Sequence, residues 1–195
     1  MRPSYLALAG LAAAVTFSQP AAAQFWSDPM NQPQMQYLDE GDGYRAQQAP
    51  IPRQLVSFTR NYAPGTIVIS TEERRLYLVT RPGEAIEYAI GVGRPGFEWA
   101  GTKTISRKAE WPSWTPPSEM RKRRPDLPAY MSGGIDNPLG ARAMYLGSSL
   151  YRIHGSNEPD TIGQAVSSGC IRMTNEDVED LYDRVKVGTR VVVIR

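Results

Sequence analysis

The sequence TIVISTEERRLYLVTRPGEAIEYAIGV, residues 66–92, decides the fold class of this chain. Short runs rich in β-branched and aliphatic residues at 66–70, 74–80 and 84–92 predict three strands. The Pro-Gly pair at 82–83 is typical of a turn, so we expect the second and third strands to form a hairpin. This part of the chain therefore begins a β-rich domain.

The rest of the chain continues the β pattern but contains one long irregular segment. The Val-Val-Val-Ile run within 190–194 indicates a strand that is buried on both faces. Residues 111–140 hold six prolines and predict an irregular segment with a short helix near 118–123. Loops of this length are usually functional or disordered, and we expect this one to form a lid or wall over a groove. Further strands are predicted at 101–109, 141–146 and 151–154.

One helix is expected near the end of the sequence. Thr174 and Asp177 have the spacing of a capping box, in which the first side chain binds the backbone amide three residues on. An apolar stripe with helical period follows, and Gly188 suits the end of the helix. The stripe consists of Val178, Leu181, Tyr182 and Val185. The pattern as a whole predicts one mainly β domain over residues 64–195, with a few short helices.

Residues 1–23 have the pattern of a secretory signal peptide. Arg2 supplies the positive start, residues 6–17 are mostly apolar, and three alanines precede Gln24, where the mature chain would begin. The apolar run is shorter than the roughly 20 residues that span a bilayer. No cysteine lies near the cleavage site, so we expect no lipid anchor. Residues 24–63, rich in Gln, Pro and Asp, predict a flexible segment. We therefore expect an exported protein.

The charge of the chain excludes little. The formal net charge is +2 at pH 7. Residues 121–124, Arg-Lys-Arg-Arg, form a basic run without interleaved aromatic residues, so we expect no binding to nucleic acid. Such a run can still attract an anionic polymer, for example a cell-wall strand.

Cys170 is the only cysteine of the chain, and His154 is the only histidine. Exported proteins usually pair their cysteines, so a single cysteine suggests an intermolecular bridge or a reactive thiol, with a buried inert thiol as the alternative. A thiol attacks an acyl group as the thiolate, and His154 is the only imidazole that can accept its proton, unless this histidine is purely structural. A zinc site would need further Cys or His ligands, so we expect no metal.

The sequence around the cysteine suits an acyl-transfer site. Gly169 lets the backbone approach a substrate closely, and the amides of Gly169 and Cys170 are candidate donors to a developing oxyanion. His154 precedes Cys170, whereas the cysteine comes first in papain-like and cell-wall endopeptidase-like families. Sortases share the order found here, but they place the histidine much further upstream and carry a Thr-Leu-x-Thr-Cys segment that this chain lacks.

Several motifs together resemble the L,D-transpeptidase catalytic domain (YkuD-like) family. They are His-Gly-Ser-Asn at 154–157, Ser-Ser-Gly-Cys-Ile-Arg-Met at 167–173 and Asn-Glu-Asp-Val at 175–178. The opening hairpin and Asn-Pro-Leu-Gly-Ala-Arg-Ala at 137–143 agree with the habits of that family. The resemblance covers residues 64–195 and implies a YkuD-like β-sandwich or barrel with a few short helices.

The resemblance also implies roles for single residues. Cys170 would be the nucleophile and His154 the proton donor and acceptor. Ser168 stands where the family often has a histidine, and with Gly169 it would shape the oxyanion pocket. Arg172 would hold a substrate carboxylate or brace the loop. No metal or organic cofactor is implied.

The implied substrate is a peptidoglycan stem peptide, cut between the L-centre of a diamino acid and a terminal D-alanine. The resulting acyl-thioester on Cys170 would be resolved by an amine of a second stem peptide, or of an outer-membrane protein or lipoprotein. This implies peptidoglycan biosynthesis, cell wall biogenesis and cell shape, a periplasmic location and acylation by carbapenems. Two alternatives stay open: an L,D-carboxypeptidase, with water as the acceptor, and a non-catalytic peptidoglycan-binding module, against which the intact His154–Cys170 pair argues.

Overall fold

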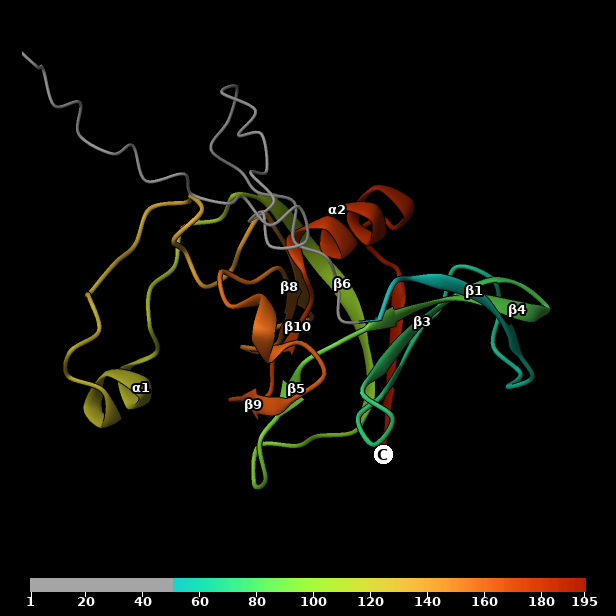
Figure 1. Ribbon diagram of the computed structural model, residues 1–195, viewed down its shortest axis with the longest axis horizontal. Helices are drawn as coiled ribbons and strands as arrows, with labels where there is room; N and C mark the ends of the chain where they lie inside the picture. The colour runs from blue at the N-terminus through green and yellow to red at the C-terminus, as the bar shows by residue number, and fades with distance from the viewer. Residues whose placement is uncertain (1–50) are drawn as a thin grey trace, which may run out of the picture. The chain divides into compact units, whose positions relative to one another are not determined.

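The computed structural model describes residues 51–195, and strands dominate this part of the chain (Figure 1). The expected signal peptide and residues 24–50 of the expected flexible segment lie outside the described residues. The elements in chain order are β1 (Gln54–Phe58), β2 (Ile67–Ser70), β3 (Arg75–Arg81), β4 (Gly83–Ala89), β5 (Val92–Gly93), β6 (Gly101–Glu110), α1 (Ser118–Arg123), β7 (Arg142–Leu146), β8 (Arg152–His154), a 3₁₀ turn (Pro159–Thr161), β9 (Ala165–Ser167), β10 (Ile171–Arg172), α2 (Asn175–Arg184) and β11 (Arg190–Ile194).

Nine of the strands form one sheet, in the order β1-β4-β3-β2-β11-β6-β7-β8-β10. The mainly β fold class that the sequence predicts is therefore confirmed. The last strand of the chain, β11, lies in the middle, parallel to β2 and antiparallel to β6. Val191 and Val193 of β11 are almost fully buried, and Val192 is also buried although it points to the other face. The predicted two-sided burial of this strand is thus confirmed.

The opening strands pair as the sequence predicts, because apolar residues alternate along them. β2, β3 and β4 are antiparallel neighbours, with Ile69 opposite Leu76 and Leu76 opposite Tyr88. These three side chains belong to the main core. Residues of the opposite face, such as Val68 and Val79, enter a second, smaller core. The sheet is therefore covered on both faces at this end.

β1 is an element that the sequence does not predict. It lies within the stretch 24–63 that we expected to be flexible, yet it pairs along its whole length with β4. Just before it, Arg53 reaches across to α2, with its Nη1 3.2 Å from Glu176 and 3.1 Å from Asp177. The flexible segment therefore does not extend over residues 54–58, which form an edge strand of the sheet.

α2 begins where the capping pattern predicts. The Thr174 hydroxyl accepts a hydrogen bond from the Asp177 amide at 3.2 Å, and Val178 and Leu181 are fully buried. The helix ends at Arg184, before Gly188, which instead adopts a positive φ of 91° in the turn that leads into β11. α2 packs on β7 and β8, so it supports the strand that carries His154.

Two short parallel pairings bring distant parts of the chain together. β10 lies parallel to β8, with Ile171 opposite Ile153 and Arg172 opposite His154. β5 and β9 form a separate two-stranded sheet beside β10, as Figure 1 shows. Strands of two or three residues carry too little periodicity to be recognised in a sequence, and these pairings position the site described next.

Candidate active site

The parallel pairing of β8 with β10 places the only thiol in the same cleft as the only imidazole. Side chains alternate along a strand, so Arg152 and His154 share one face of β8. Cys170 directly precedes β10 and lies next to Arg152 in the same register, on the same face as Arg172. All four residues line a cavity of about 370 Å³. The two residues that sequence analysis singles out for chemistry therefore share one cleft.

His154 is held as a neutral base. The residue is 4% exposed, and its Nδ1 lies 2.6 Å from the Gly155 carbonyl oxygen. A carbonyl only accepts hydrogen bonds, so Nδ1 carries the proton and Nε2 keeps a free lone pair. Burial, helped by the positive charges of Arg172 and Arg152, lowers the pKa of His154 to about 3. The imidazole is consequently uncharged at neutral pH and able to accept a proton.

Cys170 is a free thiol that is partly exposed in the cleft. Its Sγ lies 3.7 Å from the Leu150 carbonyl oxygen. Burial raises the pKa of the Cys170 thiol, while the charge of Arg152 and then that of Arg172 act in the opposite direction. Within the described residues, His154 and Cys170 are not hydrogen-bonded to each other. Such contacts often tighten only when substrate binds.

The loop before the cysteine has a backbone conformation that requires glycine. Gly169 has a φ of 102°, and a β-carbon there would lie 2.6 Å from Cε1 of Tyr151. Its carbonyl accepts a hydrogen bond of 2.8 Å from the Trp99 indole, which stacks on Tyr151. Its amide donates to the Ser167 hydroxyl at 3.1 Å. The peptide that joins Gly169 to Cys170 is thus fixed in orientation.

The other predicted site residues lie in the same cleft. The Ser168 hydroxyl accepts a hydrogen bond of 3.4 Å from Arg94. The Arg172 guanidinium lies 2.9 Å from a Glu158 carboxylate oxygen and 3.3 Å from the Thr161 hydroxyl. Arg172 therefore braces the loop that contains the 3₁₀ turn, while its side chain still borders the cleft.

The proline-rich segment 111–140 forms one wall of the cleft. Trp114 pairs with Met131 in an isolated antiparallel bridge, which joins two parts of this wall. The same wall borders a second, larger lobe of about 560 Å³, which shares Trp114, Ser168 and Arg172 with the first lobe. This arrangement agrees with the expectation that residues 111–140 form a lid or wall over a groove.

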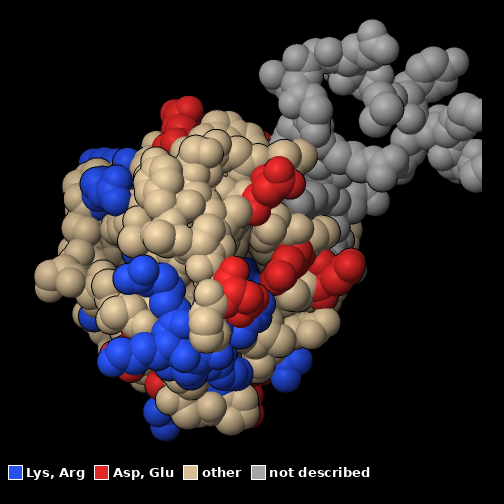
Figure 2. Space-filling model, turned by 90° about the vertical axis from the view of Figure 1, so that its left-hand side faces the viewer, with Lys and Arg blue, Asp and Glu red and all other residues tan. Residues whose placement is uncertain are grey.

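The larger lobe is basic. Arg94 and Arg123 both lie over the ring of Phe97, at 4.1 and 5.8 Å from its centroid. Neither arginine forms an ion pair with a carboxylate among residues 51–195. Figure 2 shows the face that carries α1, where Lys and Arg side chains gather. This lobe suits a ligand with negative charge.

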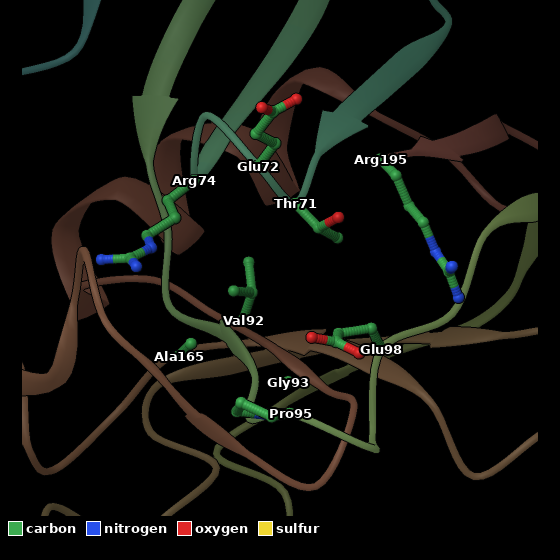
Figure 3. Close-up of a pocket in the computed structure, with 9 residues that line it drawn as sticks. All are labelled: Thr71, Glu72, Arg74, Val92, Gly93, Pro95, Glu98, Ala165 and Arg195. Atoms are coloured by element: carbon green, nitrogen blue, oxygen red, sulfur yellow. The ribbon is translucent and has the colours of Figure 1, made fainter.

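A further cavity, of about 460 Å³, lies on the other side of the β5–β9 pair. Figure 3 shows Val92 near its centre and Glu72, Glu98 and Arg195 around it, while Arg74 points away. Arg74 is occupied by a hydrogen bond of 2.7 Å to the Gly163 carbonyl. No cysteine or histidine lines this cavity.

The described part of the chain offers neither a metal cluster nor a membrane helix. No group of three Cys, His, Asp or Glu side chains in residues 51–195 is arranged to hold a metal ion. No helix of this part is long and apolar enough to cross a membrane.

Sequence reasoning misses the aromatic and cationic residues that surround the cysteine. Trp99 and Tyr151 support the Gly169 peptide, and Arg152 lies beside the thiol. Only Arg152 carries a sequence signal, since it lies two residues before His154 on a short predicted strand. The register that brings it to Cys170 comes from pairing between segments far apart in the sequence.

Comparison with known proteins identifies relatives of this chain. The chain is 42% identical over 160 residues to the "Probable L,D-transpeptidase ErfK/SrfK" of Escherichia coli, across 75% of this chain and 49% of that protein. The chain thus spans about half the length of the curated relatives it matches.

Two solved structures share the fold. A protein from Brucella melitensis described as a "Probable carnitine operon oxidoreductase caia" is 50% identical, with a TM-score of 0.52 over 75% of this chain and 96% of that one. L,D-transpeptidase 3 from Mycobacterium tuberculosis, in complex with a faropenem-derived adduct, has a TM-score of 0.53 at 18% identity, over 67% and 60% of the two chains. Residues 64–193 match the model of the L,D-transpeptidase catalytic domain (YkuD), and the chain belongs to that family.

Proposed function

We propose that this protein is an L,D-transpeptidase that acts on peptidoglycan stem peptides, with Cys170 as the nucleophile and His154 as the general base and acid. One observation carries the proposal. The neutral imidazole of His154, with Nε2 free, lies in the same cleft as the only thiol of the chain. This is the pairing that activates a cysteine for acyl transfer.

The first half of the reaction forms a thioester. His154 Nε2 takes the proton of the Cys170 thiol, and the sulfur attacks the amide carbonyl between the L-centre of the diamino acid and the terminal D-alanine. The tetrahedral intermediate then collapses and the carbon–nitrogen bond breaks. The imidazolium returns its proton to the departing amine of D-alanine, which leaves the acyl group on sulfur.

The second half transfers the acyl group to an amine. A stem peptide, or an amine of an outer-membrane protein or lipoprotein, loses a proton to the neutral His154 as it attacks the thioester carbonyl. The new amide forms, the carbon–sulfur bond breaks, and the thiol regains a proton from the imidazolium. Donor and acceptor bind in turn, which is ping-pong transfer.

The loop geometry supports an oxyanion site at Cys170. The Gly169 carbonyl is held by Trp99, and the carbonyl and amide of one trans peptide point in opposite directions. The Cys170 amide therefore points away from Trp99. The Gly169 amide is already bound to Ser167, so Cys170 supplies the principal loop donor, with Ser168 at the pocket edge.

The charge of the cleft supports a substrate with carboxylates. Arg94 and Arg123 lack ion-pair partners among the described residues and border the larger lobe. Guanidinium groups bind carboxylates through paired hydrogen bonds. Stem peptides carry several carboxylates, and Arg124 and Arg172, which are paired with Asp126 and Glu158, also line this lobe.

The proposal extends to the whole chain. Residues 1–23 direct export and are removed, residues 64–195 form the catalytic domain, and the protein works in the periplasm on the cell wall. Its activity contributes to cell-wall biogenesis and cell shape. Carbapenems inhibit it by acylating Cys170.

Incubation of the purified protein with disaccharide tetrapeptides, followed by mass spectrometry, tests the proposal. We expect a cross-linked dimer with loss of one D-alanine per link, and no product from Cys170→Ala. Tripeptide without cross-link identifies a carboxypeptidase instead. Turnover by Cys170→Ala rejects Cys170 as the nucleophile. Absence of product from the wild-type protein favours the alternative of a non-catalytic peptidoglycan-binding module.

A carbapenem should add one drug mass to the wild type and none to Cys170→Ser.

A further inference from the structure

Arg152 is the charged residue that the strand register sets next to the nucleophile. Ile153 lies opposite Ile171, so the register, continued by one residue, sets Cys170, just before β10, next to Arg152 of β8. Both line the same cavity. The thiol also contacts the Leu150 carbonyl, two residues before Arg152. A guanidinium and a thiol thus lie side by side in the cleft.

Arg152 has no carboxylate partner among residues 51–195, and its buried Nε atom has no hydrogen-bond partner there. Its contact with an aromatic ring, 5.2 Å from the centroid of Tyr145, leaves the charge uncompensated. Arg172, the other arginine beside the thiol, is paired with Glu158 at 2.9 Å. A partly buried cation without a counter-ion is costly, and Cys170 is the adjacent group that can become an anion.

His154 cannot supply a resident positive charge for the thiolate. Its burial and the two neighbouring arginines keep the imidazole neutral. The remaining ionisable groups of this cavity are Glu119 and Arg123 on α1 and the Tyr151 phenol. Both α1 side chains are exposed, and a carboxylate at Glu119 would oppose a thiolate. The permanent charge of Arg152 is therefore the one that favours ionisation.

We propose that Arg152 is a catalytic residue that stabilises the Cys170 thiolate as its counter-ion, so that in the resting enzyme the positive charge beside the sulfur resides on a guanidinium rather than on the histidine. The proposal rests on Cys170 as the nucleophile of the proposed function. It predicts that the acidity of the thiol depends on the charge at position 152. The shift of the thiol pKa by Arg152, opposite to that of burial, agrees with this direction.

Alkylation of the thiol measures its acidity without any stem peptide. Cys170 is the only cysteine, so the rate of reaction with iodoacetamide as a function of pH reports this thiolate alone. We expect Arg152→Gln to raise the apparent thiol pKa by about one unit or more, and to slow alkylation at pH 7 about tenfold or more. Arg152→Lys keeps the charge and should stay within about threefold of wild type.

Arg107→Gln is the matched control. Arg107 lies over the same Tyr145 ring, at 3.6 Å from its centroid, but does not border the cavity. Its replacement should leave the alkylation profile unchanged. Alkylation in denaturant and thermal melting check that each variant is folded and reactive. If Arg152→Gln does not fold, Arg152→Met, which preserves the side-chain stem, takes its place with the same expected result.

Three outcomes overturn the inference. The first is an unchanged thiol pKa in Arg152→Gln, the second is a rate that falls equally at every pH, and the third is an equal shift in Arg107→Gln. The last two outcomes would mean that Arg152 controls access of the reagent to the thiol or supports the Tyr145 ring. Turnover of tetrapeptide is measured separately. Its absence in the wild type rejects the proposed function, whereas an unshifted titration in an active enzyme rejects only the role of Arg152.

Discussion

At the scale of single residues, the candidate site combines a neutral base with a thiol among arginines. The backbone carbonyl of Gly155 sets the His154 tautomer, and the positive φ of Gly169 sets the approach to Cys170. Neither feature involves a charged partner for the imidazole. The neutral state of the His154 imidazole therefore depends on burial, and this burial has a consequence for stability.

Acid should destabilise the protein through His154. The unfolded chain binds a proton at a pKa of about 6.5, whereas the folded protein binds it only at about 3. Between these values the unfolded state holds more protons, so stability falls as pH falls below 6.5. At pH 5 the loss from this residue is about 2 kcal/mol.

Urea unfolding at pH 7, 6 and 5 measures this effect. His154→Gln cannot gain a proton, so its stability should fall less than that of the wild type over this range. Comparison of the two proteins removes the contribution of the carboxylates. Parallel pH dependence in both proteins would show that the folded protein protonates His154 as readily as the unfolded chain does.

At the scale of elements, short pairings and caps hold the site in place. β8 and β10 share only two register pairs, and α2 packs against β8. α2 is in turn tied to the chain before β1 by Arg53. This arginine contacts Asp177, whose side chain is only 3% exposed and whose Oδ2 has no hydrogen-bond partner among residues 51–195.

Arg53→Gln should lower the free energy of unfolding by about 1–3 kcal/mol at pH 7, because a buried carboxylate loses its cationic donor. Burial already raises the pKa of Asp177, and Arg53 opposes that rise. Without Arg53 the carboxyl is protonated more readily, so the deficit should shrink as pH falls. Chemical unfolding at pH 7 and pH 4.5 measures both effects.

Arg60→Gln provides the control for this pair. Arg60 lies 3.0 Å from Glu73, and both side chains are about as exposed as Arg53 or more. An exposed pair of this kind contributes at most about 1 kcal/mol. A deficit in Arg53→Gln no larger than that in Arg60→Gln would mean that Asp177 does not depend on Arg53.

At the scale of the described domain, β11 joins two halves of the sheet. On one side lie β1 to β4, and on the other β6, β7, β8 and β10, which carry the site. Val193 faces the main core and is 2% exposed. The core on both sides of β11 is continuous, so we expect the domain to unfold in one cooperative step.

Val193→Ala should lower stability by about 2 kcal/mol, from two lost methyl groups and the cavity they leave. The loss should appear equally in far-UV circular dichroism and in exposure of the Cys170 thiol to pulsed alkylation. Val187→Ala, at an exposed position, is the control. A shift of the dichroism midpoint without a shift in thiol exposure would show that the two halves unfold separately.

The local elements of this fold follow from the sequence alone. Alternating apolar residues predict β2, β3 and β4, and the pattern that starts at Thr174 predicts α2, because each depends on neighbours within a few residues. Composition alone shows that Cys170 cannot pair within the chain and that His154 is the one imidazole that could serve it, since the chain has one cysteine and one histidine. The family follows from motifs around those two residues.

The contacts between segments that are distant in the sequence are known only from the tertiary structure. β1, β5, β9 and β10 are strands because partners far along the chain complete their hydrogen bonds, and the described sequence around them has no period of its own. The neutral state of His154 depends on burial, and the place of Arg152 beside Cys170 depends on register. Sequence thus determined which residues can react, and long-range packing decided their charge and their neighbours.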